Sequence, residues 1–167
     1  MNEKKIAIIY YSRVGHTEEV AKELSDRIGG KLVPLEDNKR RTGILHYLGA
    51  GFGAMFNVRT TIRPVKCDLD SFDTIVFGSP VWSWNMTPAA RAFIEEYKHR
   101  LQGKELVFFT TSASTPPKRI VRRMEKLGAF KASGMAGFVE GDFTPAKQDV
   151  MADKLDRLAD MVLGKAG

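Results

Sequence analysis

The chain alternates between short apolar runs and longer segments in which apolar residues recur every three or four positions. The first run, residues 5–11 (KIAIIYY), is continuous and rich in β-branched residues, which is typical of a strand covered on both faces. Four later segments also have strand character: residues 31–35, 74–78, 105–110 and 132–139. Pro34 would remove a ladder hydrogen bond from the second strand and therefore favours a place at the sheet edge.

Segments with helical spacing lie between the predicted strands. From Val20 to Ile28, apolar residues recur at helical spacing, two glutamates lie near the N-terminal end, and Gly29-Gly30 ends the helix. Further helices are predicted at residues 89–97, 116–127 and 146–163. This alternation predicts an α/β fold, a three-layer α/β/α sandwich with a five-stranded, mostly parallel sheet and right-handed crossovers.

Residues 36–70 interrupt this alternation of strands and helices. Apolar residues between Ile44 and Phe56 would share one face of a glycine-interrupted helix. A crossover helix is the simpler interpretation, and the alternative is an apolar segment that lies over a site or contacts a partner. No repeat, low-complexity tract or linker marks a second domain, so we expect a single domain over residues 1–167.

Composition narrows the class of protein. The chain is 43% hydrophobic and 28% charged, as in ordinary soluble globular proteins. The N-terminal apolar run is short for a signal peptide and no run of about twenty apolar residues occurs, so we expect a cytoplasmic protein without stable membrane insertion. Cys67 is the only cysteine and has no internal disulfide partner. The net charge of +6 favours acidic partners.

A turn of small and polar residues separates the first strand from the first helix. In an open parallel sheet, ligands bind at the carboxyl ends of strands, and the first strand usually borders that crevice. A phosphate there would meet freed backbone N–H groups and the hydroxyls of Ser12 and Thr17, while Gly15 permits close approach. The simpler interpretation is that Thr17 caps the helix and Gly15 allows a tight turn. The turn has neither a P-loop ending nor a GxGxxG fingerprint, which disfavours ATP and a Rossmann-bound NAD.

Two further polar segments follow predicted strands. Residues 78–88 (GSPVWSWNMTP) contain both tryptophans, which either cover something planar or pack back onto the domain. Residues 110–115 (TTSAST) leave backbone amides and hydroxyls accessible to a ligand, although Ser/Thr runs are usually turns.

Together, these three segments resemble the three FMN-contacting loops of the flavodoxin-like family. The S-x-x-G-x-T pattern at residues 12–17, the tryptophan segment and the TTSAS segment stand in the family's order, and the resemblance covers nearly the whole chain. It implies the sheet order 2-1-3-4-5 and FMN as cofactor, with its phosphate in the first loop and its ring between the others. The implied cofactor-binding residues are Ser12, Arg13, Val14, Gly15, His16, Thr17, Pro80, Val81, Trp82, Ser83, Trp84, Asn85, Thr111, Ser112, Ala113 and Ser114.

The chain departs from the family pattern in two respects. Val14 stands where the commonest phosphate loop has another hydroxyl, so its backbone N–H must serve, helped by the neighbouring Arg13 and His16. Typical flavodoxins are strongly acidic, whereas this chain is basic, so its partners should differ. The tryptophan segment resembles that of the flavodoxin-like oxidoreductases of bacteria and archaea more than that of the small electron carriers.

The resemblance implies an FMN-dependent oxidoreductase that passes electrons between a reduced donor, NAD(P)H or a protein, and a quinone or other small acceptor. Because the cofactor supplies the chemistry, we expect no catalytic acid/base pair; backbone amides of residues 82–85 and 112–114 would contact the ring, and Trp82 or Trp84 would stack on it. Two alternatives remain: a flavodoxin-type electron carrier without turnover of its own, and a flavin-free binding module on the same fold.

Basic residues form a second feature of the sequence. Those from Lys118 to Lys126 lie at helical spacing, and with residues 39–41 they would either be solvated or dock an acidic redox partner or a pyridine nucleotide phosphate. No nucleic-acid-reading motif accompanies them, so we expect no nucleic acid. His16, His46 and His99 lack metal-ligand spacing, so we expect no metal site. The oligomeric state stays open.

Overall fold

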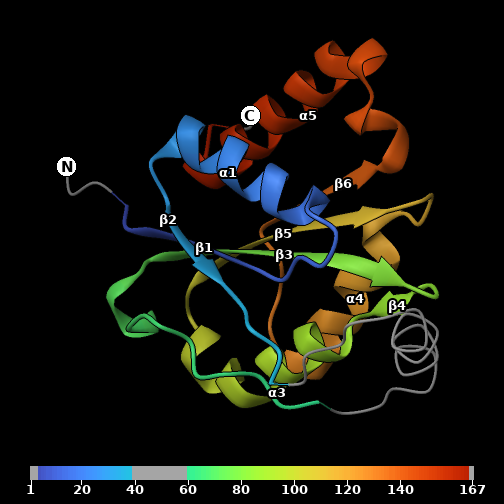
Figure 1. Cartoon of the computed structure of the whole chain (residues 1–167). Coiled ribbons are helices and arrows are strands. Elements are labelled where there is room, and N and C mark those ends of the chain that lie inside the picture. Colours follow the sequence, from blue (N-terminus) through green and yellow to red (C-terminus); the bar gives the residue numbers. More distant parts are fainter. Residues whose placement is uncertain (1–3, 39–59, 166–167) are drawn as a thin grey trace.

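A parallel sheet forms the centre of the computed structural model, which describes residues 4–38 and 60–165 (Figure 1). Its strands run in the order β2-β1-β3-β5-β6, and all four pairings along this path are parallel. The bounds are β1 Ile6–Tyr10, β2 Lys31–Pro34, β3 Thr74–Trp82, β5 Glu105–Ser112 and β6 Gly134–Val139. Numbered along the chain without the short β4, the order is 2-1-3-4-5, so the predicted sheet and its edge strand β2 are confirmed.

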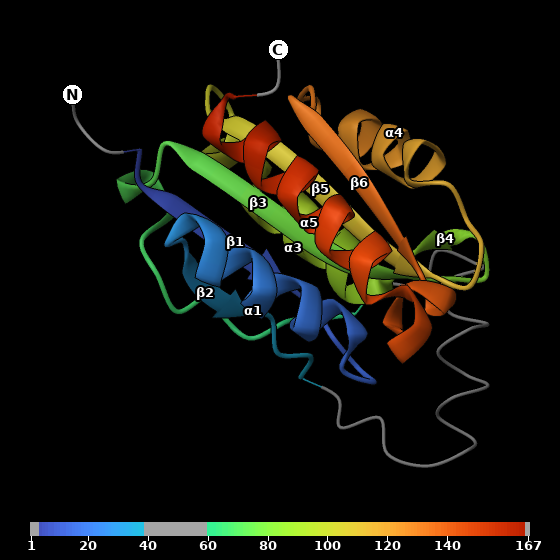
Figure 2. The ribbon, with the colours of Figure 1, turned by 90° about the horizontal axis from the view of Figure 1, so that it is seen from above.

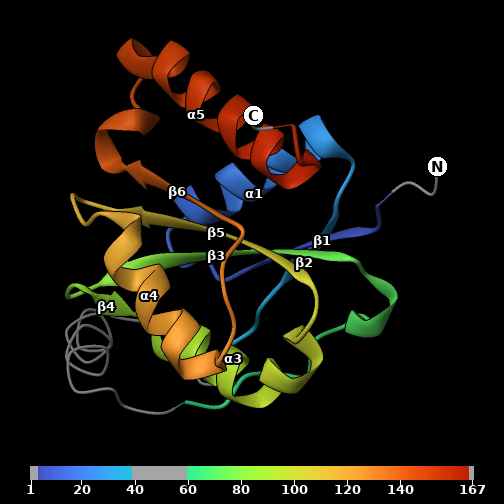
Figure 3. The same ribbon diagram turned by 180° about the vertical axis from the view of Figure 1, so that it is seen from behind.

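Helices cover both faces of the sheet. Helices α1 and α5 lie side by side over one face (Figure 2), and α3 and α4 lie over the other (Figure 3). Their bounds are α1 His16–Ile28, α3 Pro88–Leu101, α4 Pro117–Gly128 and α5 Gln148–Leu163. The predicted three-layer sandwich is therefore confirmed. Within the described residues, no helix has the length and apolar character needed to cross a membrane.

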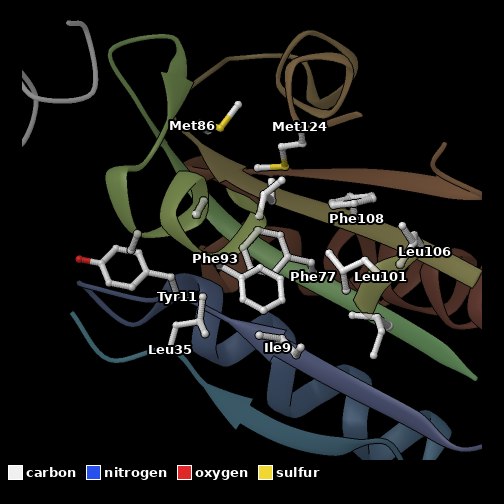
Figure 4. Packing of buried hydrophobic residues seen from close by; sticks show 14 of the residues in the cluster. Ile9, Tyr11, Leu35, Phe77, Met86, Phe93, Leu101, Leu106, Phe108 and Met124 are labelled. Carbon is white, nitrogen blue, oxygen red and sulfur yellow. The ribbon is translucent and has the colours of Figure 1, made fainter. Parts of the chain in front are cut away.

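The core is divided between the two faces of the sheet. Side chains alternate along a strand, so Ile6 and Ile8 pack under α1 and α5 while Ala7 and Ile9 pack against α3 and α4. On the α3 side, the rings of Phe77 and Phe93 stack with centroids 4.8 Å apart (Figure 4). Burial on both faces explains why β1 and β3 have continuous rather than alternating apolar sequences.

The predicted end of the third strand is wrong, and it lies in the tryptophan segment. Strand β3 does not end at Gly78 but continues to Trp82 and turns back into the antiparallel β4, Asn85–Met86, so this segment is a hairpin rather than an irregular loop. Pro80 is tolerated within β3 because pairing with β1 ends opposite Gly78, so the missing N–H leaves no gap in that ladder.

The segment 36–70 is described only at its two ends. Asp37 and Ile62 form an isolated antiparallel bridge, and Ile62 and Leu69 are buried in the core beneath α3. The helix predicted between Ile44 and Phe56, His46 and the basic run at 39–41 lie outside the described residues.

Candidate functional site

The segments that follow β1, β3 and β5 meet at the carboxyl end of the sheet around a pocket of about 290 Å³. Eleven of the sixteen predicted site residues line it: Arg13, Val14, His16, Thr17, Pro80, Val81, Trp82, Ser83, Thr111, Ser112 and Ala113. The remaining five, Ser12, Gly15, Trp84, Asn85 and Ser114, are not among the lining residues. The three strand ends therefore converge on one hollow, as the topology requires.

The turn between β1 and α1 exposes the amino end of the helix. Gly15 has a φ of 108° and precedes the first helical residue, and its carbonyl accepts the N–H of Glu19 at 2.8 Å. No side chain caps this end in the described structure, so Thr17 does not have the capping role considered above. A Cβ built on Gly15 would meet no atom within 4 Å. The turn thus leaves open space beside the positive end of the α1 dipole.

A buried hydroxyl contact joins the first and third segments. The Oγ1 atoms of Thr17 and Thr111 lie 2.7 Å apart, and both residues are buried. The third segment is further tied by Ser112, whose Oγ accepts the N–H of Thr115 at 2.9 Å and donates to its carbonyl at 3.1 Å. The polar side of the pocket is therefore preorganised by its own hydrogen bonds.

Ser12 lies under the same turn and carries an unsatisfied group. Its Oγ is buried and has no hydrogen-bond partner within the part of the chain that the structure describes. A buried hydroxyl without a partner costs about 1–3 kcal/mol, so such atoms usually have one. A bound molecule could therefore supply the hydrogen-bond partner that the Ser12 hydroxyl lacks.

The β3–β4 hairpin forms the aromatic side of the pocket. Ser83 and Trp84 have φ values of 47° and 56°, the sign pattern of a type I′ turn, although such turns usually contain glycine. Trp82 lines the pocket, and the Arg13 guanidinium lies 5.4 Å from its ring centroid in a cation–π contact. The Tyr11 ring meets Trp82 edge-on at 5.9 Å. Of the two tryptophans, the structure brings Trp82 to the pocket.

Trp84 and Asn85 have other surroundings. The Trp84 side chain is 63% exposed, whereas Asn85 is buried. The Asn85 Oδ1 accepts the N–H of Met86 and a guanidinium N–H of Arg123, both at 2.9 Å, and Arg123 also donates to the Trp84 carbonyl at 3.4 Å. These bonds hold the hairpin in its left-handed turn and attach it to α4.

The sequence reasoning missed a fourth wall of the pocket. Glu140 lines it from the 3₁₀ turn Glu140–Phe143, which follows β6, and the Phe143 ring stacks on His16 with centroids 4.2 Å apart. An acidic residue directly after the fifth strand was a usable signal, because that strand ends at the same sheet edge.

Asp142 anchors this turn. Its buried carboxylate accepts the Val139 N–H at 2.8 Å and forms an ion pair with Lys154. Burial acts to raise the pKa of Asp142, but the Lys154 and Val139 hydrogen bonds outweigh it and hold the pKa below its usual value. Among the described residues, no group of three or more His, Cys, Asp or Glu side chains is arranged to hold a metal ion.

Solved structures share this architecture. A flavoprotein from Lactobacillus acidophilus, solved in complex with FMN, is 22% identical with a TM-score of 0.69 over 92% of this chain and 99% of its own. A protein of Bacteroides eggerthii assigned to the flavoproteins is 23% identical with a TM-score of 0.70 over 93% and 98%. The two-electron reduced flavodoxin of Megasphaera elsdenii is 16% identical with a TM-score of 0.63 over 96% and 99%. At these identities the likeness establishes the fold.

A family model provides independent evidence from the sequence. The model of the flavodoxin domain matches residues 42–152, about two thirds of the chain. This range includes the β3–β4 hairpin and the end of β5, whereas the turn at residues 12–17 precedes it. By this match and by its sheet order, the chain belongs to the flavodoxin family.

Proposed function

We propose that this chain binds FMN noncovalently in the pocket at the carboxyl end of the sheet. The observation that carries the proposal is the pocket's division into a hydroxyl-rich end beside the start of α1 and an aromatic end at Trp82. A molecule with a phosphate at one end and a planar ring at the other matches this division. The volume lies at the lower bound of roughly 300–1,000 Å³ that is usual for ligand pockets.

The phosphate fits the turn between β1 and α1. The buried Ser12 hydroxyl gains an acceptor, the first N–H groups of α1 point at an anion, and Gly15 leaves room above the turn. Val14 contributes no side-chain donor and is 73% exposed, so only its backbone N–H is available. Arg13 and His16 also line the pocket and add favourable charge or hydrogen bonding.

The ring fits between the β3–β4 hairpin and the segment after β5. The Trp82 side chain stacks on it, and the backbone of residues 82–83 and 111–113 excludes water and contacts its polar edge. When bound, FMN supplies one- and two-electron chemistry. The chain's own residues orient the cofactor and set the polarity around it, and we propose no acid/base residue for the reaction.

We further propose that the protein acts as an oxidoreductase that passes electrons between a reduced donor, NAD(P)H or a protein, and a quinone or other small acceptor. Family membership and the resemblance of the tryptophan segment to that of flavodoxin-like oxidoreductases support this proposal. Donor-dependent turnover would distinguish an enzyme from a flavodoxin-type carrier, which shows none with NAD(P)H.

The absorption spectrum of the purified protein tests the proposal most directly. We expect a yellow protein, or a colourless one that takes up FMN in a one-to-one titration with quenching of flavin fluorescence. Riboflavin, which lacks the phosphate, should bind at least about tenfold more weakly, because charge-assisted hydrogen bonds are lost. A protein that neither contains nor takes up FMN would leave only the flavin-free alternative.

A further inference from the structure

Helix α4 presents a basic face without acidic partners. It carries five exposed basic side chains: Lys118, Arg119, Arg122, Arg123 and Lys126. None of them forms an ion pair with an acidic residue in the described part of the chain. The only acid of the helix is Glu125, whose carboxylate accepts the N–H of Ala132 at 2.9 Å. We call these five residues the α4 basic face; no acidic side chain within residues 4–38 and 60–165 neutralises their charges.

Charge is distributed unevenly between the two helical layers. Helices α1 and α5, on the opposite face of the sheet, each carry four acidic and two basic residues. Figures 1 and 3 show that α4 lies in the other layer, beside β4. Such an asymmetric field turns an approaching acidic macromolecule toward the α4 side and raises its association rate.

An exposed aromatic side chain lies next to this face. Trp84 is 63% exposed at the tip of the β3–β4 hairpin, and its carbonyl accepts a hydrogen bond from Arg123 of the α4 basic face. Neighbouring Ser83 lines the pocket. Tryptophan and arginine are the residue types that contribute most to protein interfaces, and an exposed tryptophan held in a strained turn is uncommon without such a use.

The shape of the face indicates the kind of occupant. From Lys118 to Lys126 it extends about 12 Å along the helix axis, so its cations spread out instead of converging on one small anion. Single-stranded nucleic acids stack on a series of aromatic platforms, whereas this surface offers one. An extended protein surface with several carboxylates and an apolar patch complements the arrangement better.

We propose that the α4 basic face and Trp84 form a docking surface for an acidic protein. The face begins directly after the segment that closes the pocket, so a docked protein lies over the pocket's edge. This inference goes beyond the proposed function and uses it for one point only: a partner in this position can exchange one electron with the protein, without any bond being made or broken.

The test measures binding of the FMN-loaded, full-length protein to a small acidic iron–sulfur ferredoxin by titration calorimetry. We expect the dissociation constant to rise at least about tenfold between 20 and 200 mM NaCl, as salt screens the exposed charges. The double variant Arg119→Glu/Arg122→Glu should weaken binding at least about thirtyfold. Trp84→Ala should weaken it by about tenfold or more at either salt concentration, because the anchor is apolar.

A matched charge control lies at the other end of the molecule. Lys31 and Lys165 are exposed, and Lys31 pairs with the start of β1, opposite the pocket end of the sheet. The variant Lys31→Glu/Lys165→Glu makes the same change in net charge and should alter binding less than about threefold. Equal losses in both double variants would show a net-charge effect and overturn the assigned surface.

Two other outcomes also decide the inference. If the protein does not bind ferredoxin at 20 mM NaCl, the proposal that its partner is an acidic protein is wrong. The same follows if it binds duplex DNA more tightly than ferredoxin at that salt concentration. The FMN spectrum is recorded separately for each variant. A chain that binds ferredoxin through α4 but takes up no FMN would retain the docking surface and refute the proposed function.

Discussion

The hydroxyl oxygens of Thr17 and Thr111 lie 2.7 Å apart, and this contact joins the first turn of α1 to the end of β5. Both residues are buried at the hydroxyl-rich end of the pocket. Each hydroxyl can donate to the other, so one of the two protons remains available to a bound anion. The contact thus ties α1 to β5, and both of its residues also line the candidate site.

Replacing Thr17 by glutamate should abolish retention of FMN. The new carboxylate would be buried beside the proposed phosphate, where repulsion between like charges is poorly screened, and we expect a loss of affinity of at least about a hundredfold. Flavin fluorescence titration measures the effect. Thr17→Ser keeps the contact with Thr111 and should bind FMN within about threefold of the parent. A folded glutamate variant with parental affinity would remove the assignment of the phosphate turn.

The substitution Ser12→Ala should affect the free energy of unfolding and the affinity for FMN in different ways. The Ser12 hydroxyl has no partner in the described structure, so its removal should leave the free energy of unfolding of the flavin-free protein unchanged or raise it by up to about 1 kcal/mol. Loss of a bond to the phosphate should weaken FMN binding about tenfold. Urea unfolding and fluorescence titration report the two quantities.

Thr110→Val is the matched control for Ser12→Ala. The Thr110 hydroxyl is likewise buried without a described partner, but Thr110 belongs to β5 and not to the turn at residues 12–17 where the phosphate is proposed to bind. Its replacement should also leave stability unchanged or slightly raised, with no effect on FMN affinity. A Ser12→Ala variant with unaltered FMN affinity would show that the phosphate is not held there, and a destabilised variant would show that the Ser12 hydroxyl has a partner in the flavin-free protein.

The two tryptophans should differ in their effect on flavin binding. Trp82 lines the pocket whereas Trp84 is largely exposed, so Trp82→Ala should weaken FMN binding about tenfold, since aromatic contacts contribute roughly 0.5–1.5 kcal/mol beyond the area they bury. Trp84→Ala should change FMN affinity less than about threefold. If the Trp82 variant titrates like the parent protein, stacking on Trp82 is excluded.

Asp142 should make stability depend on pH in the acid range. Its pKa is lowered in the folded protein, so its contribution is complete above the unfolded pKa of about 4 and is lost as the pH falls through the folded pKa. Asp142→Asn should therefore lower the free energy of unfolding by about 1–3 kcal/mol at pH 7, and the two proteins should converge as the pH falls through the folded pKa of Asp142.

Asp160→Asn provides the comparison for this experiment. Asp160 is exposed near the end of α5, so its replacement should change stability by less than about 0.5 kcal/mol at pH 7. Urea unfolding across the pH range measures both variants. A constant difference between Asp142→Asn and the parent from pH 7 to pH 2 would contradict the assigned cause of the lowered pKa.

Much of the site was predictable because its residues follow strands. Parallel strands that end at the same edge bring the segments after them together, which is why residues from the turn at 12–17 and from 111–113 line one pocket. The hairpin was not predicted, because Pro80 and the adjacent glycine and serines have the composition of an irregular loop, whereas pairing of Val81 with Met86 makes them strand. Glu140 was missed because it is remote in sequence from the three recognised segments.

By itself, the sequence determined the order of the five parallel strands and of the helices along the chain, because continuous apolar runs and period-3.6 patterns record which segments avoid water. Only the tertiary structure decided which tryptophan meets the pocket, that Thr17 contacts Thr111, and that Phe143 stacks on His16. The direction of a side chain in a turn depends on the signs of its backbone angles. A contact between distant segments depends on how the layers pack, and neither property leaves a periodic trace in the chain.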